Sequence, residues 1–381
     1  MASTMEQQAT TKTDWLATAR RLSDEFATRA AKHDGDDSFV AENYAAMREA
    51  KLFSAPIPAE LGGGGITYAE HAAIIRIIAR GCGSTALAYS MHSHPLQATI
   101  LRHRNGAQPP AEPLLRRIAK EELVIVTSGG SDWIEGSGTL VKDGTDYIFN
   151  ARKIFSSGSP AGDVMLTMGV YEDPEKGPQV FHFGVNMHDP GVKVQNNWHT
   201  MGMRGTGSND VVIENVKVPD ASISVRRPKG KWHPSFDVVA AMAFPLIGSA
   251  YVGIAEAARD LALQMAQKRR DDPVTQSLVG EMDTELLIAQ DALDALVGAI
   301  QGGAKPSLAL SDLTFKRKTI VANALARTVH LAMEVAGGGS FFRDKGLERH
   351  FRDIQAMRFH PLHERRQQLF SGRLALGLDP V

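Results

Sequence analysis

The stretch that decides the fold is residues 122–160, ELVIVTSGGSDWIEGSGTLVKDGTDYIFNARKIFSSGSP. It opens with an apolar run rich in Val and Ile, which breaks at the polar segment 128–132. Two short segments of alternating character follow, 138–142 and 147–150, and Asp143-Gly144-Thr145 joins them. Because period-2 segments joined by such a turn form hairpins, the stretch predicts antiparallel β-strands.

Two polar loops in this stretch, 127–131 and 155–158, are expected to lie side by side on one edge of the sheet. The Gly-Gly pair of the first loop lets a ligand approach the backbone closely. Ser and Thr supply donors for ring nitrogens and carbonyl oxygens, and Phe155 offers a flat face. Together, the open backbone, the hydroxyls and the aromatic face suit a planar ring such as an isoalloxazine. A β-hairpin with Ser and Gly turns and no ligand has the same composition, so the pattern alone leaves both interpretations open.

Composition describes a globular protein of more than one core. The chain has 381 residues and a formal net charge of −1, which gives no global indication of nucleic acid or an acidic membrane as a partner. We expect no membrane-spanning segment, since no apolar run looks long enough. The N-terminus lacks an apolar signal-peptide core. The single Cys82 cannot form an intrachain disulfide, which fits a reducing, cytoplasmic location.

Hydrophobic periodicity changes twice along the chain. Helical spacing dominates the first third, strand-like segments with frequent turns follow, and long helical segments return after Phe236. No helix separates the central strands, which argues against a parallel sheet. The predicted class is α+β, with an N-terminal helical domain (1–121), a central antiparallel β-barrel or sandwich (122–235) and a C-terminal four-helix bundle (236–381).

The amino-acid sequence of these segments resembles that of the acyl-CoA dehydrogenase superfamily. In its middle domain a Thr-led Gly–Ser–Asp loop and a Lys–x–aromatic–x–Ser/Thr loop hold a flavin, as 127–132 and 153–157 would here. Three further motifs occur in the family's order: "P-x-x-x-G-G" at 58–63, "LGMRGTxS…VxVP" at 201–219 with Met201 in place of Leu, and "GGxG…RD" from Gly337 to Asp353. The resemblance covers nearly the whole chain and implies the same three-part fold.

The resemblance also implies cofactor contacts and an assembly. The residues implied for the flavin ring are Val126, Thr127, Ser131, Phe155, Ser156 and Ser157. Those implied for the dinucleotide phosphates are Arg270, Gly337 and Gly338, which favour FAD over FMN, with FMN as the alternative. Without a ligand, Arg269-Arg270 would be a solvated charge run and the Gly run a helix C-cap. A homotetramer is expected, because the family's FAD crosses a subunit interface.

The carboxylate base of an acyl-CoA dehydrogenase is missing at both family positions. Such an enzyme removes a proton α to a thioester, which requires a carboxylate in reach. A gapless count from Arg352-Asp353 places Pro361 at the usual glutamate, and alignment on 253–256 places Ala243 at the alternative one. A shift of three residues would bring in Glu364. The neighbouring His360 is able to act as a base, since its ordinary pKa lies near neutrality.

This departure is typical of the superfamily's two-component flavin monooxygenases, such as dibenzothiophene monooxygenase. These enzymes resemble the dehydrogenases in fold and take reduced flavin from a separate reductase to activate oxygen. The matching catalytic candidates are His360, His92 and Ser157, although the branch's "LHDP" is here FHPL, without the Asp. His92 and His94 face different sides of a helix, so at most one lines a given site, and a packed core histidine is the alternative for either. We expect no metal at His360 and His363.

Three functions follow from the sequence. The first is a two-component flavin monooxygenase that acts on a small organic substrate with a reductase as partner. The second is an acyl-CoA dehydrogenase with a displaced base. The third is a non-enzymatic, DNA-associated flavoprotein, suggested by the arginines Arg349, Arg352, Arg358, Arg365, Arg366 and Arg373. The balanced global charge argues against the third.

Overall fold

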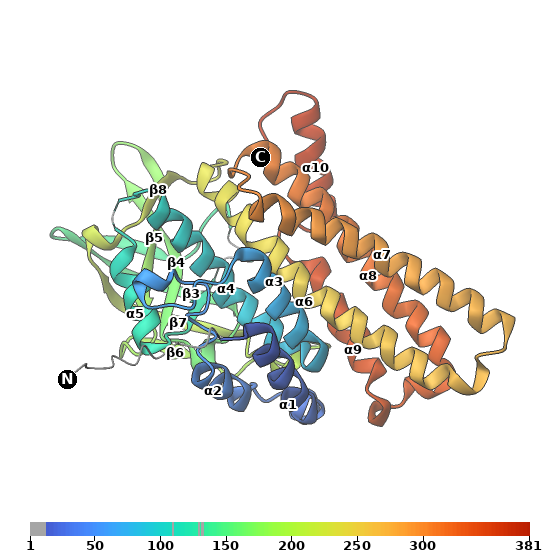
Figure 1. Cartoon of the computed structure of the whole chain (residues 1–381). Coiled ribbons are helices and arrows are strands. Elements are labelled where there is room, and N and C mark those ends of the chain that lie inside the picture. Colours follow the sequence, from blue (N-terminus) through green and yellow to red (C-terminus); the bar gives the residue numbers. More distant parts are fainter. Residues whose placement is uncertain (1–12, 109, 129, 131–132) are drawn as a thin grey trace, which may run out of the picture.

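The computed structural model describes residues 13–108, 110–128, 130 and 133–381. Figure 1 shows three parts: N-terminal helices, a sheet beside them, and long C-terminal helices that extend away from the sheet. The predicted fold class is thereby confirmed. The change from helix to strand lies between Glu121 and Ile125, and the bundle begins at Pro234. The domain limits at 121/122 and 235/236 stay predictions.

In the described residues, the N-terminal part contains five α-helices packed beside the sheet and the bundle. Helix α3 begins at a capping box in which Thr67 and Glu70 satisfy each other's backbone donors. The bounds are α1 (Trp15–Asp36), α2 (Ala41–Glu49), α3 (Tyr68–Gly81), α4 (Gly83–Arg104) and α5 (Glu112–Glu121).

The sheet is mixed, which corrects the expectation of a purely antiparallel barrel or sandwich. The strands are β1 (Ile125–Thr127), β2 (Thr139–Asp143), β3 (Asp146–Ser156), β4 (Val164–Asp173), β5 (Gly177–Asn186), β6 (Val192–Val194), β7 (Asn209–Val218) and β8 (Val225–Pro228). Their order is β6-β7-β3-β2-β4-β5-β8, with β1 beside β4. The predicted hairpin is present, since β2 and β3 pair antiparallel with Leu140 opposite Phe149.

The two parallel pairings have one cause. Strand β1 runs along the first half of β4 and β2 along its second half, both parallel to it. Strands β1 and β2 therefore run in the same direction along one edge of β4. Period-2 patterning marks a strand but does not give the direction of its partner, so the sequence did not reveal this.

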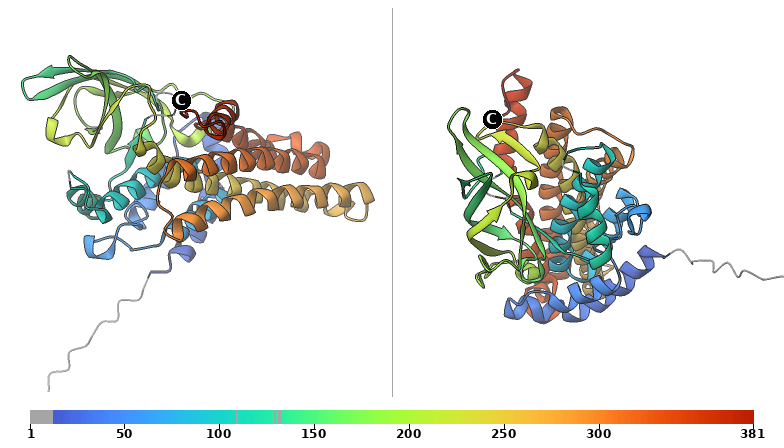
Figure 2. Two further views of the ribbon diagram at one scale, coloured as in Figure 1. Left: turned by 90° about the horizontal axis from the view of Figure 1, so that it is seen from above. Right: turned by 90° about the vertical axis from the view of Figure 1, so that its left-hand side faces the viewer.

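The C-terminal part is built around a single buried helix. Its helices are α6 (Pro234–Ala266), α7 (Pro273–Gln301), α8 (Leu308–Ala336), α9 (Leu347–Ile354) and α10 (Glu364–Ala375), and Figure 2 shows α7 and α8 side by side. Among the described residues, only 234–269 are long and apolar enough to span a bilayer, contrary to the sequence expectation. In this structure 89% of the most apolar window is buried, as in the core helix of a globular protein.

Two motifs that lie far apart in sequence are contact partners. The Arg352 guanidinium binds Asp34 of α1, Glu348 and the Met201 carbonyl, and the Asp353 carboxylate accepts a hydrogen bond from the Met203 amide. A Cβ on Gly202 would lie 2.4 Å from the Arg352 carbonyl oxygen, so only glycine permits this approach. The arginine–aspartate pair therefore fastens the 201–203 loop to α9.

Helices α3 and α6 approach most closely at Gly253. A Cβ there would lie 2.2 Å from the backbone oxygen of Arg76, a clash that no rotamer change relieves. Beside this contact the Arg76 guanidinium donates to Glu256. The glycine thus fixes how deeply α6 is buried.

We predict that Gly253→Ala destabilises the protein by about 1–3 kcal/mol, because the backbones must separate. Gly280→Ala in α7 is the matched control, since nothing lies within 4 Å of its added Cβ. That variant is expected to be neutral or slightly stabilising, because alanine favours a helix. Urea unfolding of both variants measures the difference, and equal midpoints would refute the close-contact explanation.

Candidate active site

The end of β3 presents an aromatic ring to solvent. Phe155 has a φ of 56°, in the left-handed region that bulky residues rarely adopt, where the β3–β7 register shifts between Lys153 and Ser156. Its side chain is 55% exposed. One edge contact supports it, with the Trp198 ring centroid 6.0 Å away. The backbone therefore holds an apolar face open at the sheet edge.

A chain of hydroxyls lies next to this ring. The Ser157 and Ser208 Oγ atoms are 2.7 Å apart, and Ser208 Oγ is also 2.7 Å from Thr206 Oγ1. The Gly158 amide donates to the Thr206 carbonyl, which ties the end of β3 to the short helix η3 (Arg204–Thr206). Hydrogen bonds between their hydroxyls thus join two sequence motifs, 155–158 and 204–208, and within them Thr206 and Ser208 are buried.

The end of β1 supplies the other predicted flavin loop. The Val126 side chain is fully buried in the sheet, so only its backbone is available to a ligand. Thr127 is half-buried at the strand end, and the Ser128 hydroxyl lies 2.7 Å from Thr167 Oγ1. The predicted contact Ser131 lies outside the described residues. Ser156 Oγ is buried with no hydrogen-bond partner among the described residues, so it is a donor left for a ligand or water.

Both ring nitrogens of His92 form hydrogen bonds with backbone groups. Its Nδ1 accepts the Ile125 amide at 2.9 Å and its Nε2 lies 2.9 Å from the Phe53 carbonyl oxygen, which accepts from it. Burial lowers the pKa of His92 to about 4, so the ring is neutral and can make both bonds. The ring joins α4 to β1 and has no nitrogen left for a substrate. We therefore assign it a structural role in place of the predicted catalytic one.

His360 lies in a cluster from three helices. Its Nε2 is 2.8 Å from the Tyr251 hydroxyl of α6, and its backbone oxygen accepts from the Lys318 ammonium of α8 at 2.7 Å. Burial, then the charge of Lys318, then His94 of α4 lower the pKa of His360 to about 3. At neutral pH the His360 ring is therefore uncharged.

Of the two α4 histidines, His94 is the one that contributes to the lowered pKa of His360, whereas both ring nitrogens of His92 are bonded to the backbone. Burial lowers the pKa of His94 to about 3 as well. Tyr251 and Lys318 were not predicted from the sequence, and His94 was considered only as the alternative to His92. Of the two missed residues, Lys318 carried a signal, as a cation on the apolar side of a predicted helix, between Phe315 and Val321.

The predicted phosphate contacts lie elsewhere. The Arg270 side chain is exposed and its nearest ion pair is Asp271 at 3.8 Å. Arg269 is the cation beside Gly337, where its guanidinium donates to the Val335 carbonyl. Gly337 has φ 71° and ψ −163°, a conformation reserved for glycine, and Gly338 has open space around it. Figures 1 and 2 show this end of α8 away from the sheet, so one subunit does not bring the ring and phosphate contacts together.

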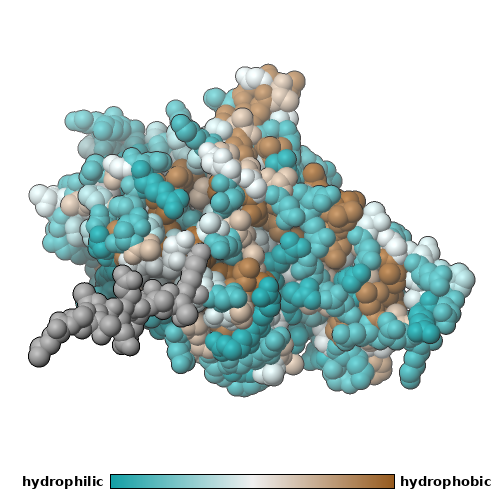
Figure 3. Space-filling view, in the orientation of Figure 1, coloured by the Kyte–Doolittle hydropathy of each residue, from teal (hydrophilic) through white to brown (hydrophobic). Residues whose placement is uncertain are grey.

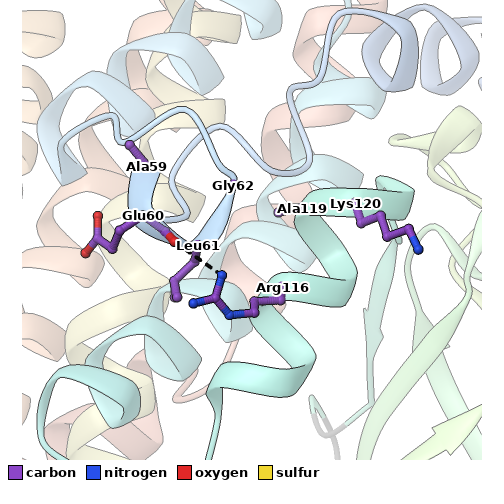
Figure 4. A pocket seen from close by; sticks show the side chains of 7 residues that line it. All are labelled: Ala59, Glu60, Leu61, Gly62, Arg116, Ala119 and Lys120. Atoms are coloured by element: carbon purple, nitrogen blue, oxygen red, sulfur yellow. Dashed lines mark hydrogen bonds between the residues drawn. The ribbon is translucent and has the colours of Figure 1, made fainter.

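One surface hollow is separate from these groups. It has a volume of about 430 Å³ and lies between the short helix η1 (Ala59–Leu61) and α5, where Arg116 donates to the Glu60 carbonyl (Figure 4). None of the predicted flavin contacts or the His360 cluster lines it.

The sheet edge fits a flavin ring. It offers an exposed aromatic face at Phe155, a hydroxyl at Ser157, a half-buried Thr127 at the end of β1, and an unpartnered buried hydroxyl at Ser156. The hydrogen bond from Ile125 to His92 binds this edge to α4, which carries His94 toward His360. The ring-binding edge and the histidine cluster are thus connected through one helix.

Comparison with known proteins agrees with this architecture. Profiles described as acyl-CoA dehydrogenase N-terminal, middle and C-terminal domain match residues 10–122, 127–216 and 245–365. A putative acyl-CoA dehydrogenase, YdbM of Bacillus subtilis, is 28% identical over 368 residues, covering 91% of this chain and 92% of the relative. Dibenzothiophene monooxygenase of Mycolicibacterium goodii is 26% identical, covering 92% and 90%.

A solved structure has the same fold. KijD3 in complex with FMN and dTDP-3-amino-2,3,6-trideoxy-4-keto-3-methyl-D-glucose superposes with a TM-score of 0.87 at 26% identity, covering 96% of this chain and 93% of that one. The protein is therefore an enzyme of the helix–sheet–helix oxidoreductase class. It belongs to the acyl-CoA dehydrogenase superfamily, in which its relatives include the monooxygenase branch.

We predict that His360 stays neutral from about pH 5 to about pH 8, because its folded pKa lies far below the ordinary value near 6.5. Since the unfolded chain binds this proton and the folded one does not, acidification from about pH 6 toward pH 3 destabilises the fold. NMR titration of ¹³C-histidine-labelled protein, assigned with His360→Ala, measures this. A His360 signal that titrates near pH 6.5 would contradict the buried, neutral cluster.

Proposed function

We propose that this enzyme is a two-component flavin monooxygenase that uses reduced flavin and oxygen on a small organic substrate. The observation that carries the proposal is that a neutral His360–Tyr251 pair lies next to Pro361, which occupies the position of the family's usual glutamate. With a pKa of about 3, His360 is a poor base for a proton α to a thioester. It is well suited to donate and accept hydrogen bonds without carrying charge.

The nearest carboxylates do not replace the missing base. Glu364 is exposed on the first turn of α10, where it accepts from Gln368. Asp353 is buried and bound to the Met203 amide, and burial raises its pKa to about 6. Both are engaged in holding helices and loops.

We assign each residue a role from its position in the site. A bound reduced flavin supplies the electrons that activate oxygen. Phe155 offers the flat face against which the ring stacks, and Ser157 and Thr127 offer hydroxyls to its polar edge. His360 and His94 would face the ring from the bundle side, exclude water and hold a proton at an imidazole nitrogen near the reacting oxygen.

The flavin and its partners are part of the proposal. KijD3 holds FMN, so we favour FMN over the FAD predicted from sequence. FAD is the alternative, in which Arg270 and Gly338 would contact the phosphates of a flavin held mainly by a neighbouring subunit. Mass spectrometry of flavin bound after reconstitution tests the choice. The amino-sugar nucleotide bound by KijD3 makes a polar small molecule the first substrate class to test. A separate reductase would supply the reduced flavin.

The proposed homotetramer rests on exposed apolar residues of the C-terminal helices. Figure 3 shows apolar colour over this part of the molecule. The large exposed side chains are Val274, Leu287, Ile288, Leu313, Ile320, Phe341, Phe342, Phe359, Leu369 and Leu376. Patches of this kind mark subunit contacts. Light scattering at micromolar concentration would show a monomer if this assembly is wrong.

An acyl-CoA dehydrogenase is the second candidate, favoured by the similarity to YdbM. Anaerobic titration of the flavin-loaded enzyme with acyl-CoA thioesters separates the two functions. Rapid bleaching of the flavin would establish dehydrogenation and refute the monooxygenase. DNA association has no comparable support. Arg352, one of the arginines that suggested it, forms ion pairs with Asp34 and Glu348 and is not available to bind phosphates.

We predict that His360→Ala leaves flavin binding nearly unchanged but speeds hydrogen peroxide release by about tenfold, the effect of losing one hydrogen bond of about 1.4 kcal/mol. Stopped-flow mixing of reduced enzyme with oxygenated buffer, with a peroxide assay, measures both quantities. His363→Ala is the matched control, since His363 is exposed three residues further on. Identical peroxide kinetics in wild type and His360→Ala would remove His360 from the reaction.

A further inference from the structure

The loop that carries His360 buries one apolar side chain after the histidine, Leu362, but is exposed on the side before it. It follows the short 3₁₀ helix η8 (Gln355–Phe359), and the preceding Phe359 is 79% exposed. The residue after His360 is a proline, which has no amide to donate. A histidine in such a loop needs outside contacts to keep one orientation.

Lys318 provides the first contact. Its ammonium is buried in α8 and donates to the carbonyl oxygens of both His360 and Leu362 at 2.7 Å. Burying an ammonium is costly, and the hydrogen-bond partners of Lys318 among the described residues are these two carbonyl oxygens, not a carboxylate. Burial lowers the pKa of Lys318 to about 8, with Glu364 opposing the shift. The two carbonyls therefore supply the hydrogen bonds that keep this cation inside, and the cation in turn pins both ends of the 360–362 turn.

Tyr251 provides the second contact. It is fully buried, and among the described residues its hydroxyl has one hydrogen-bond partner, His360 Nε2 at 2.8 Å. If Nε2 carried the proton, the tyrosine hydrogen would be buried without an acceptor, which is costly. The network thus assigns Tyr251 as donor and Nε2 as acceptor, and a neutral His360 then carries its proton on Nδ1.

We propose that Tyr251 and Lys318 are positioning residues for His360: Lys318 fixes the backbone, and Tyr251 fixes the ring as the Nδ1–H tautomer. His360 then offers a donor, Nδ1–H, to whatever occupies the site. This proposal rests on the proposed function only for the statement that His360 takes part in the reaction. The tautomer of His360, and the clamp that Lys318 forms on residues 360–362, are properties of the protein without any ligand. The titratable groups that face His360 are Tyr251 of α6, Lys318 of α8 and His94 of α4.

The tautomer is tested without any turnover. Magic-angle-spinning NMR of ¹³C,¹⁵N-histidine-labelled enzyme distinguishes Nδ1–H from Nε2–H, and the His360 signal is assigned by its absence in His360→Ala. We expect Nδ1–H in the wild type and a shift toward Nε2–H in Tyr251→Phe. Tyr68→Phe is the matched control, because Tyr68 is also buried and bonds the α6 backbone at the Met242 carbonyl. An Nε2–H signal in the wild type, or no change in Tyr251→Phe, would overturn the assignment.

The clamp is tested by hydrogen exchange. We expect Lys318→Met to speed amide exchange in residues 358–364 by about tenfold, while α7 keeps its protection. Lys318→Arg, which retains the donors, should restore most of the protection. Equal exchange of 358–364 in wild type and Lys318→Met refutes the clamp, and Lys318→Arg decides the case if the methionine variant fails to fold. If both tests succeed but acyl-CoA bleaches the flavin, the proposed function fails while the positioning roles stand.

Discussion

The burial of α6 is the constraint on which the rest of the molecule depends. This helix lies at the centre of the bundle, and small residues on its surface let its neighbours approach, most closely α3 at Gly253. A helix held so firmly has little freedom to rotate, because interiors are packed as densely as crystals. Tyr251, two residues before Gly253, therefore has a fixed direction. Tyr251 in turn orients His360 through its hydroxyl, and we propose that His360 orients the reacting side of the site.

Buried cations fasten the loops that surround the site. Lys153 donates to the Ser137 and Met168 carbonyls, Arg227 to the Trp133 and Ile134 carbonyls, and Lys318 to those of His360 and Leu362. Loops expose backbone carbonyls that no strand or helix satisfies, and a long cationic side chain reaches several at once. The ring-binding edge and the histidine loop are thus rigid for the same physical reason, which suits a site that must exclude water.

Local patterns predicted the fold, and contacts between distant residues were the part that the sequence did not reveal. The hairpin of β2 and β3 and the three-part order follow from periodicity and turns. The parallel pairing with β4 does not, because a strand's pattern is the same for either direction of its neighbour. Among the histidines, spacing showed that His92 and His94 face different sides of a helix. Which of them meets His360 depends on how α4 lies against β1, and the structure selects His94.

The same limit applies to the residues around His360. Its ring partner lies 109 residues away and its backbone partner 42 residues away, separations that no local motif encodes. The family resemblance singled out His360 because it follows Arg352-Asp353 in the sequence. The structure explains why its ring is neutral, since burial and the charge of Lys318 lower its pKa. Arg270 and Gly338 were also identified from a motif, but within one subunit they lie apart from the ring-binding edge.

The central claim is that this site captures reduced flavin for reaction with oxygen and releases the oxidised form. Anaerobic titration of the wild-type protein with FMN in its two redox states, followed by fluorescence and repeated with Phe155→Ala, tests it most directly. We expect reduced FMN to bind at least about tenfold more tightly than oxidised FMN, a difference of about 1.4 kcal/mol, and Phe155→Ala to weaken the binding of both. Equal affinity, or tighter binding of the oxidised form, would contradict it.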